Sequence, residues 1–181
     1  MTVDVDTAAV HAGGSLFVGI TELKRGHWQT LKAMRLAALQ NAPAAFVNTS
    51  AAERGLTPED WQARFTDATW VAARVGLDYA GIARLAPPED GLPWVRFVES
   101  VWVEPRYRRQ GVLREMMEHL AILAQIAGAS ELRLWVLDTN EPAFDAYQKL
   151  GFDPMLVSQE TEKRSNGGAP VMERLMSRPI L

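Results

Sequence analysis

The sequence contains no cysteine, and this absence removes several kinds of chemistry at once. Without a thiol the chain forms no disulfide framework, builds no thiolate metal site and uses no cysteine nucleophile. Histidine is scarce too, because only His11, His27 and His119 occur and none belongs to an H-E-x-x-H pattern. We therefore expect neither a metal centre nor a disulfide-stabilised fold.

Long apolar runs and an excess of basic charge are also missing. No stretch approaches the roughly 18 apolar residues of a membrane-spanning helix, and no basic segment precedes an apolar core at the N-terminus. The net charge of -3 does not suit a non-specific nucleic-acid binder. The patterns G-x-x-x-x-G-K-[ST], G-x-G-x-x-G and G-x-S-x-G are absent as well. The sequence predicts a cytoplasmic protein without a membrane or nucleic-acid partner.

What is present suits one globular domain. The chain has 181 residues, 48% of them hydrophobic and 23% charged, which is an ordinary balance for a fold with a sizeable core. Residues 1–15 are small and polar and include Gly13 and Gly14. We expect them to form a flexible leader, followed by a single domain over residues 16–181.

The most informative stretch is VRFVESVWVEPRYRRQGVLR, residues 95–114. Its β-branched and aromatic residues predict a strand that ends near Glu104, because Pro105 removes a backbone donor. Beyond that proline, apolar residues recur three or four apart. This spacing predicts a helix that opens at Gln110 or Gly111.

Four arginines surround the predicted helix start, at Arg106, Arg108, Arg109 and Arg114. A helix N-terminus carries partial positive charge, so each nearby cation costs about 0.3–1 kcal/mol unless an anion neutralises it. Free backbone N–H groups, a glycine that permits close approach and flanking arginines together suit a diphosphate. The alternative is an exposed basic turn, solvated or paired with neighbouring glutamates.

The remaining patterns predict an α/β (α+β) domain. Helical spacing covers residues 27–40, 57–65, 112–127 and 141–150. Strand patterns cover residues 16–23, 69–75, 79–85, 95–104, 131–137, 155–159 and 171–176. The strand at 131–137 follows a strand and a helix, so we expect it to run parallel to the central strand.

Two segments resemble one protein family. Residues 101–114 resemble the acetyl-CoA-binding motif of the Gcn5-related N-acetyltransferases (GNAT), a strand followed by R-x-x-G-x-G/A at a helix start. Leu113 stands where the family usually has Gly or Ala. A second segment resembles the family's N-x-x-A-x-x-x-Y-x-x-x-G-F pattern, on Asn140, Ala143, Tyr147, Leu150, Gly151 and Phe152.

The resemblance implies the GNAT fold. That fold is a mixed, mostly antiparallel sheet of about six or seven strands, flanked by helices and splayed between its two central parallel strands. It also implies an N-acetyltransferase that transfers the acetyl group of acetyl-CoA to a primary amine by direct attack in a ternary complex. Acetyl-CoA would be a co-substrate. The positions that would bind it are Val101, Trp102, Val103, Arg108, Arg109, Gln110, Gly111, Val112, Leu113, Arg114 and Asn140.

A general base is useful in this reaction, because an alkylamine with a pKa near 10.4 is mostly protonated at neutral pH. The resemblance suggests a strand glutamate, and Glu99 is the candidate. Because strand side chains alternate, we expect Glu99 to share a face with Val101. The alternative is a surface glutamate paired with Arg96 or Arg133.

Tyr147 is the candidate general acid for the coenzyme A thiolate as it leaves. The alternative is a core aromatic residue beside Phe144. Asn140 would hydrogen-bond the cofactor, cap the helix that follows it, or do both.

The sequence does not identify the amine acceptor. The resemblance makes Phe46, Asn48 and Glu53 candidates for contact with it, against an ordinary loop with Phe46 in the core. A homodimer is an open possibility for the assembly. The alternative function is a non-catalytic module of the same fold that binds acyl-CoA or another phosphate ligand as a sensor.

Overall fold

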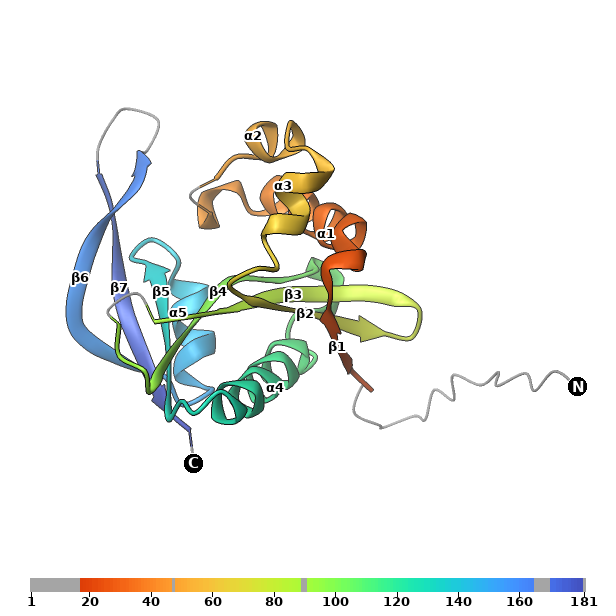
Figure 1. The fold of residues 1–181 in the computed structure, drawn as a ribbon. Coiled ribbons are helices and arrows are strands. Elements are labelled where there is room, and N and C mark those ends of the chain that lie inside the picture. The colour runs from red at the N-terminus through yellow and green to blue at the C-terminus, as the bar shows by residue number, and fades with distance from the viewer. Residues whose placement is uncertain (1–16, 47, 89–90, 165–169, 181) are drawn as a thin grey trace, which may run out of the picture.

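The computed structural model describes residues 17–46, 48–88, 91–164 and 170–180. The expected leader at residues 1–15 lies outside this part of the chain. Within it, one seven-stranded sheet carries helices on both faces (Figure 1). Its strands are β1 (Gly19–Leu23), β2 (Thr69–Val75), β3 (Asp78–Ala86), β4 (Val95–Val103), β5 (Glu131–Leu137), β6 (Asp153–Arg164) and β7 (Pro170–Pro179).

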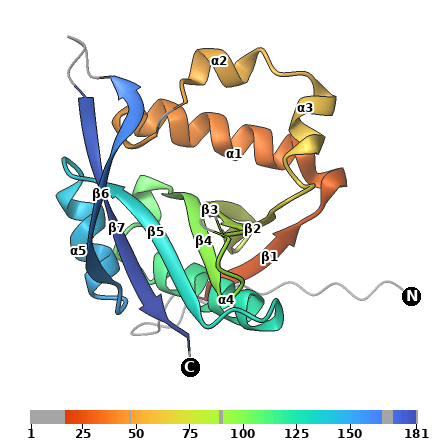
Figure 2. The ribbon, with the colours of Figure 1, turned by 60° about the vertical axis from the view of Figure 1, so that its left-hand side comes forward.

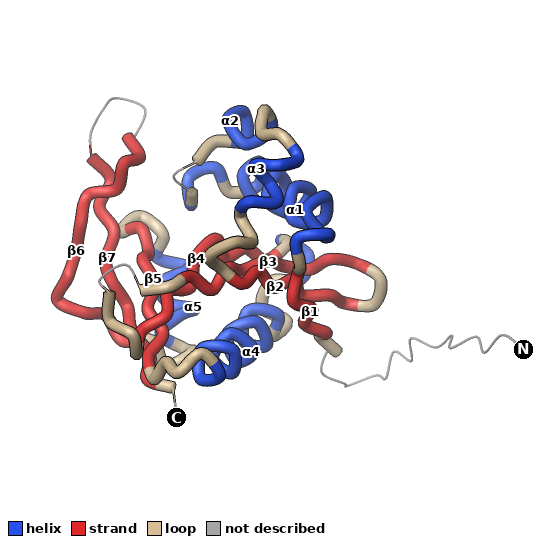
Figure 3. Tube along the Cα trace, viewed as in Figure 1, coloured by secondary structure: helices blue, strands red, loops and turns tan. Residues whose placement is uncertain are grey.

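The helices form two groups on opposite sides of the sheet (Figures 2 and 3). The first three cover one face, and the last two cover the other. The described residues also form three 3₁₀ turns: η1 (Arg25–His27), η2 (Pro43–Ala45) and η3 (Pro105–Tyr107). The α-helices are α1 (Trp28–Asn41), α2 (Ser50–Arg54), α3 (Pro58–Ala63), α4 (Val112–Ile126) and α5 (Glu141–Gln148).

The sheet has the order β1-β2-β3-β4-β5-β7-β6. Every neighbouring pair is antiparallel except β4 and β5, because helix α4 returns the chain before β5 begins. Pairing between β4 and β5 runs only from Val95, opposite Glu131, to Phe97, opposite Arg133. The mostly antiparallel sheet with two splayed parallel strands is therefore confirmed.

Apolar clusters anchor both helical layers. Met116 of α4 and Phe152 are fully buried on one face, and Leu31 of α1 and Trp61 of α3 are fully buried on the other. Burial of each such side chain contributes about 1.5–3 kcal/mol. Apolar packing on both faces thus holds the sheet in place and supports the splayed arrangement of β4 and β5.

Most predicted elements are confirmed, with shifts of a few residues at their ends. The helix expected at 57–65 shows the local reason. Thr57 Oγ1 accepts from the Asp60 backbone N–H at 3.2 Å, and the Asp60 carboxylate accepts from the Thr57 N–H at 2.9 Å. This capping box, with Pro58 in the first turn, starts α3 where the sequence predicts.

Two regions differ from the prediction. Helix α2 was missed, because a five-residue helix is too short to show a period, although Thr49 caps it. The last hairpin is longer than predicted and irregular. Three residues at 155–157 lie between the pairs Pro154–Met176 and Ser158–Arg174, opposite Leu175 alone. This bulge interrupts the alternation that marks a strand in sequence.

Two findings concern what the structure does not contain. In the part of the chain that it describes, no group of three or more His, Asp or Glu side chains is placed to hold a metal ion. Among the same residues, no helix has both the length and the apolar character needed to cross a membrane.

Candidate active site

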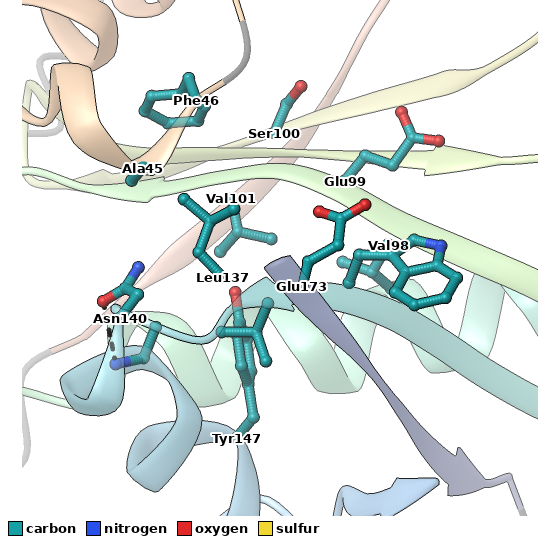
Figure 4. A pocket seen from close by; sticks show the side chains of 13 residues that line it. Ala45, Phe46, Val98, Glu99, Ser100, Val101, Leu137, Asn140, Tyr147 and Glu173 are labelled. Carbon is teal, nitrogen blue, oxygen red and sulfur yellow. Dashed lines mark hydrogen bonds between the residues drawn. The ribbon is translucent and has the colours of Figure 1, made fainter. Parts of the chain in front are cut away.

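The divergence of β4 and β5 opens a cavity of about 140 Å³ (Figure 4). Both strands, the η2 turn, helix α5 and strand β7 contribute to its wall. Its lining residues are Ala45, Phe46, Val98, Glu99, Ser100, Val101, Trp135, Val136, Leu137, Asn140, Ala143, Tyr147 and Glu173.

Strand β4 presents a backbone edge to this cavity. Its pairs with β5 end at Phe97, whereas on its other side Trp102 and Val103 still pair with β3. The Trp102 side chain is buried on the face of the sheet that α1 covers. Its Nε1 donates to Asn41 Oδ1 at 3.5 Å. The backbone of residues 98–103 is therefore the part of β4 that a ligand with amide groups can pair with.

A bulge in β4 corrects the expected orientation of Glu99. Trp102 pairs with Ile82 and Glu99 pairs with Arg84, so β4 has one more residue than β3 in this interval. The extra residue is accommodated at Ser100, which adopts a positive φ of 53°. Because the bulge shifts the alternation, Glu99 and Val101 point to opposite faces of the sheet (Figure 4). The prediction that they share a face is therefore wrong.

The Glu99 carboxylate nevertheless lines the cavity. Its ion-pair partner is Arg84 on the adjacent strand, not Arg96 or Arg133. The pair is about one-third exposed, with side-chain exposures of 29% for Arg84 and 31% for Glu99. The carboxylate is thus held at the cavity wall while it stays accessible to water, and its role as a base stays a prediction.

Tyr147 reaches the cavity from α5, with its hydroxyl end toward the splayed strands (Figure 4). The ring is 8% exposed and packs edge-on against Phe152, at 5.8 Å between centroids, in an apolar cluster that Phe144 also contacts. Burial raises the pKa of the Tyr147 hydroxyl above its ordinary value near 10. The group is therefore a neutral hydrogen-bond donor throughout the physiological pH range.

Asn140 caps α5, as one of its two predicted roles requires. Its Oδ1 accepts from the backbone N–H of Ala143 at 3.4 Å, and both residues line the cavity. The cap is confirmed. The hydrogen bond to a cofactor stays a prediction.

The start of α4 carries no side-chain cap. Gly111 occupies the N-cap position with φ of 89°, and an added Cβ there would meet no atom within 4 Å. The first backbone bond of the helix runs from Glu115 N to Gly111 O, so the N–H groups before Glu115 point out of the helix end. Open space, free donors and the helix dipole coincide at this point, which suits an anion.

The arginines around this helix start have different partners. Arg106 pairs with Asp78 at 3.3 Å. Arg108 donates to the Val103 carbonyl at 3.0 Å and to Asn41 Oδ1 at 2.8 Å, so it ties the end of β4 to the end of α1.

Arg109 and Arg114 are exposed and have no ion-pair partner among the described residues. Glu118 pairs instead with Arg178 at 2.9 Å, and no ion pair among the described residues joins Glu104 or Glu115 to either arginine. Two unpaired cations beside a bare helix N-terminus fit a diphosphate better than a neutralised basic turn does.

Three other residues at this turn that were predicted to bind the cofactor also make contacts within the protein. Val112 is buried and Leu113 packs against the cluster under α4, so the Leu113 side chain has a place in the core. Gln110 Nε2 donates to the Arg106 carbonyl at 2.6 Å and steadies the turn. Neither arrangement blocks the backbone N–H groups of the helix start.

The acceptor candidates separate into one that lines the cavity and two that do not. Phe46 belongs to the cavity wall. Glu53 is 2% exposed and accepts from Arg35 at 3.0 Å and from Asn48 at 3.1 Å. It also pairs with Arg64 at 3.2 Å. The expected contact of Glu53 with the acceptor is therefore wrong, because this carboxylate is sealed inside a charge cluster.

Several cavity residues were missed in the sequence. Ser100 and Glu173 lie on two different strands, and no local pattern joins them. Only the bulge in β4 and the register of β7 bring them together. A pairing register that spans distant segments leaves no short-range signal.

Comparison with known proteins identifies the family. The model of the acetyltransferase (GNAT) family matches residues 34–152, which include the uncapped helix start, both splayed strands and Tyr147. The chain belongs to the GNAT family. The predicted resemblance is confirmed.

Two named acetyltransferases match parts of the chain. Over 55 residues the chain is 42% identical to the thialysine N-epsilon-acetyltransferase of Bos taurus. These residues make up 30% of this chain and 32% of that protein. It is 34% identical over 102 residues to the streptothricin acetyltransferase of Streptomyces lavendulae, 55% of this chain and 50% of that protein. The matches thus span half or less of these relatives.

A solved structure extends the likeness in fold. The yncA protein of Salmonella typhimurium, solved with its cofactor acetyl-CoA, superposes with a TM-score of 0.70 at 16% identity. The superposition covers 91% of this chain and 95% of that one. At this identity the likeness supports the fold alone.

The helix start offers a direct test. Gly111→Val should weaken coenzyme A binding about tenfold or more, because the side chain enters the open space before the free N–H groups and shifts the left-handed turn. The matched control is Gly128→Val at the other end of α4, where φ is 79° and the space is also open. Calorimetric titration with coenzyme A should show a loss for Gly111→Val alone. Equal affinities in both variants would contradict the assignment.

Proposed function

We propose that this GNAT protein transfers the acetyl group of acetyl-CoA to a primary amine by direct attack in a ternary complex. The observation that carries the proposal is the unpaired β4 edge, which faces the Tyr147 hydroxyl across one cavity. An uncapped helix start, with two arginines that have no ion-pair partner among the described residues, follows the same strand. The name of one relative, thialysine N-epsilon-acetyltransferase, places the acetyl group on a nitrogen, and this supports the choice of acceptor.

The residues present fit acetyl-CoA. The N–H groups from Val112 to Arg114 and the side chains of Arg109 and Arg114 would hold its diphosphate. The backbone of Val101 and Val103 would pair with its amide-bearing arm as an added strand. Bound there, acetyl-CoA supplies an activated acyl group on a thiol leaving group.

The chain's own groups would then act on the bound substrates. A backbone N–H of the 101–103 segment would stabilise the oxyanion that forms at the thioester carbonyl. Glu99 would take a proton from the substrate ammonium, directly or through one water, so that the neutral amine attacks the thioester carbonyl, and Tyr147 would donate a proton to the departing sulfur. The apolar wall of Val98, Val136 and Leu137 would limit access of bulk water to that sulfur.

Incubation with acetyl-CoA and a broad panel of primary amines tests this function. We expect amine-dependent release of the coenzyme A thiol, well above the rate of hydrolysis. Binding of coenzyme A without turnover of any amine would favour the sensor module instead. Absence of binding would count against both.

Tyr147→Phe should slow turnover about tenfold and leave coenzyme A affinity unchanged. The loss is modest because a thiol with a pKa near 8.5 leaves readily without full proton transfer. Since burial raises the pKa of Tyr147 above 10, its hydroxyl keeps its proton as the pH rises to that value, so parent and variant should show the same alkaline profile. Tyr79→Phe, which removes an exposed hydroxyl outside the cavity, is the control. An unaltered rate in Tyr147→Phe removes this residue from the mechanism.

A further inference from the structure

The hydroxyl of Ser100 lines the cavity without a protein partner. In the part of the chain that the structure describes, no hydrogen bond joins this side chain to another residue. The acidic and amide side chains of the same wall already have donors on their oxygens, at Glu99, Asn140 and Glu173. A serine hydroxyl has one proton and two lone pairs, so Ser100 can both accept a hydrogen bond from a ligand and donate one.

The backbone at Ser100 is strained. Its φ of 53° lies in the left-handed region, where a Cβ comes too close to the neighbouring backbone. A bulge whose extra residue has this conformation usually carries glycine there. Among the described residues, Arg109 at the start of α4 is the other residue with positive φ that is not glycine. Strain of this kind at a cavity wall indicates a use for the side chain that glycine would not supply.

Ser100 and Tyr147 approach the gap between β4 and β5 from opposite sides (Figure 4). Ser100 rises from β4 on the same side as Glu99, whereas the hydroxyl end of Tyr147 comes from the side of α5. The backbone of residues 101–103, which would hold the thioester carbonyl, follows Ser100 directly. An amine that attacks this carbonyl from the Ser100 side therefore stays clear of Tyr147, which would serve the sulfur.

We infer that the Ser100 hydroxyl orients the attacking amine. Its oxygen accepts a hydrogen bond from one N–H of the neutral amine, and this bond directs the nitrogen lone pair at the thioester carbonyl. A neutral primary amine has two N–H groups, so one can bind Ser100 while the lone pair attacks. The role transfers no proton to Ser100. The inference rests on the proposed acetyl transfer and adds to it a residue that contacts the acceptor.

Two variants at Ser100 separate its hydroxyl from its backbone. Ser100→Ala and Ser100→Gly should each lower kcat/KM for the amine about tenfold, the effect of one lost hydrogen bond, and leave coenzyme A affinity unchanged. The amine is the one that the parent acetylates fastest in the panel above. Ser100→Gly should melt at a higher temperature than Ser100→Ala, because glycine adopts this φ without the steric cost of a Cβ. Equal loss of activity at different stability cannot come from unfolding.

The pH profile separates this role from that of a base. Ser100 stays un-ionised between pH 6 and 10, so both variants should show a profile parallel to that of the parent, with the same loss at each pH. The matched control is Ser158→Ala, which removes an exposed hydroxyl on β6 outside the cavity and should change neither kcat/KM nor coenzyme A affinity.

Four results would overturn the inference. Unchanged kcat/KM in both variants would reject it and leave acetyl transfer intact. A loss of coenzyme A affinity equal to the loss in kcat/KM would place Ser100 at the cofactor instead of the amine. A loss in Ser100→Ala that Ser100→Gly does not share would show that only the backbone of the bulge matters. If the parent acetylated no amine of the panel, the inference would fall together with the proposed function.

Discussion

Glu99→Gln is expected to lower kcat about 100-fold at pH 7, the low end of the usual effect of a general base. An amine with a pKa near 10.4 must lose a proton before it can attack, and the amide cannot accept it. The free fraction of such an amine rises about tenfold per pH unit below its pKa. The defect of the variant should therefore shrink as the pH approaches 10, and stopped-assay rates between pH 6 and 10 measure this directly.

The matched control for this prediction is Arg84→Gln. It breaks the same ion pair, because Arg84 is the partner of Glu99, but leaves the carboxylate in the cavity wall. A pair this exposed contributes about 0–1 kcal/mol to stability, so both variants should fold. If Arg84→Gln lost as much activity as Glu99→Gln, the pair would matter for position and Glu99 would not be the base.

Glu53→Gln is expected to destabilise the fold by about 3–5 kcal/mol, the usual cost of removing one partner from a buried ion pair. Glu53 and Arg35 have side-chain exposures of only 3% and 5%, and Arg64 completes the cluster at 3.2 Å from the same carboxylate. Burial already lowers the pKa of the Arg64 guanidinium from its ordinary value, and Glu53 opposes that shift. Without Glu53, two arginines face each other with no counter-charge.

Chemical denaturation of the variant measures this loss. The control is Glu22→Gln, which breaks the exposed pair of Glu22 with Lys24. That pair is shorter, at 2.7 Å, yet should contribute only about 0–1 kcal/mol because solvent screens it. A loss below 1 kcal/mol in Glu53→Gln would show that the cluster is solvated or that the arginines rearrange.

The cluster around Glu53 also bears on the site. Arg35 stacks on Phe46 at 4.6 Å, and Phe46 lines the cavity, so the buried charges support one part of its wall. Destabilised variants at Glu53 should therefore change acceptor KM before they change coenzyme A affinity. The reason is that α4, which carries the uncapped helix start, packs on the opposite face of the sheet.

The accuracy of the predictions followed the range of the interactions involved. The strand at 131–137 was predicted to the residue, because alternation along one strand is visible in sequence. Helix α2 was missed, because five residues hold too little periodic information. The orientation of Glu99 was wrong, because the extra residue at Ser100 shows only in the pairing of β4 with β3.

The sequence by itself determined the order of the elements, the arginine-rich helix start at Gly111 and the cap at Asn140. These features depend on backbone preference, charge and spacing within a few residues, and such information is local. Only the tertiary structure decided which side chains share the cavity. Glu173 comes to face Glu99 through the register of three strands that are far apart along the chain, and register is set by packing of the whole sheet.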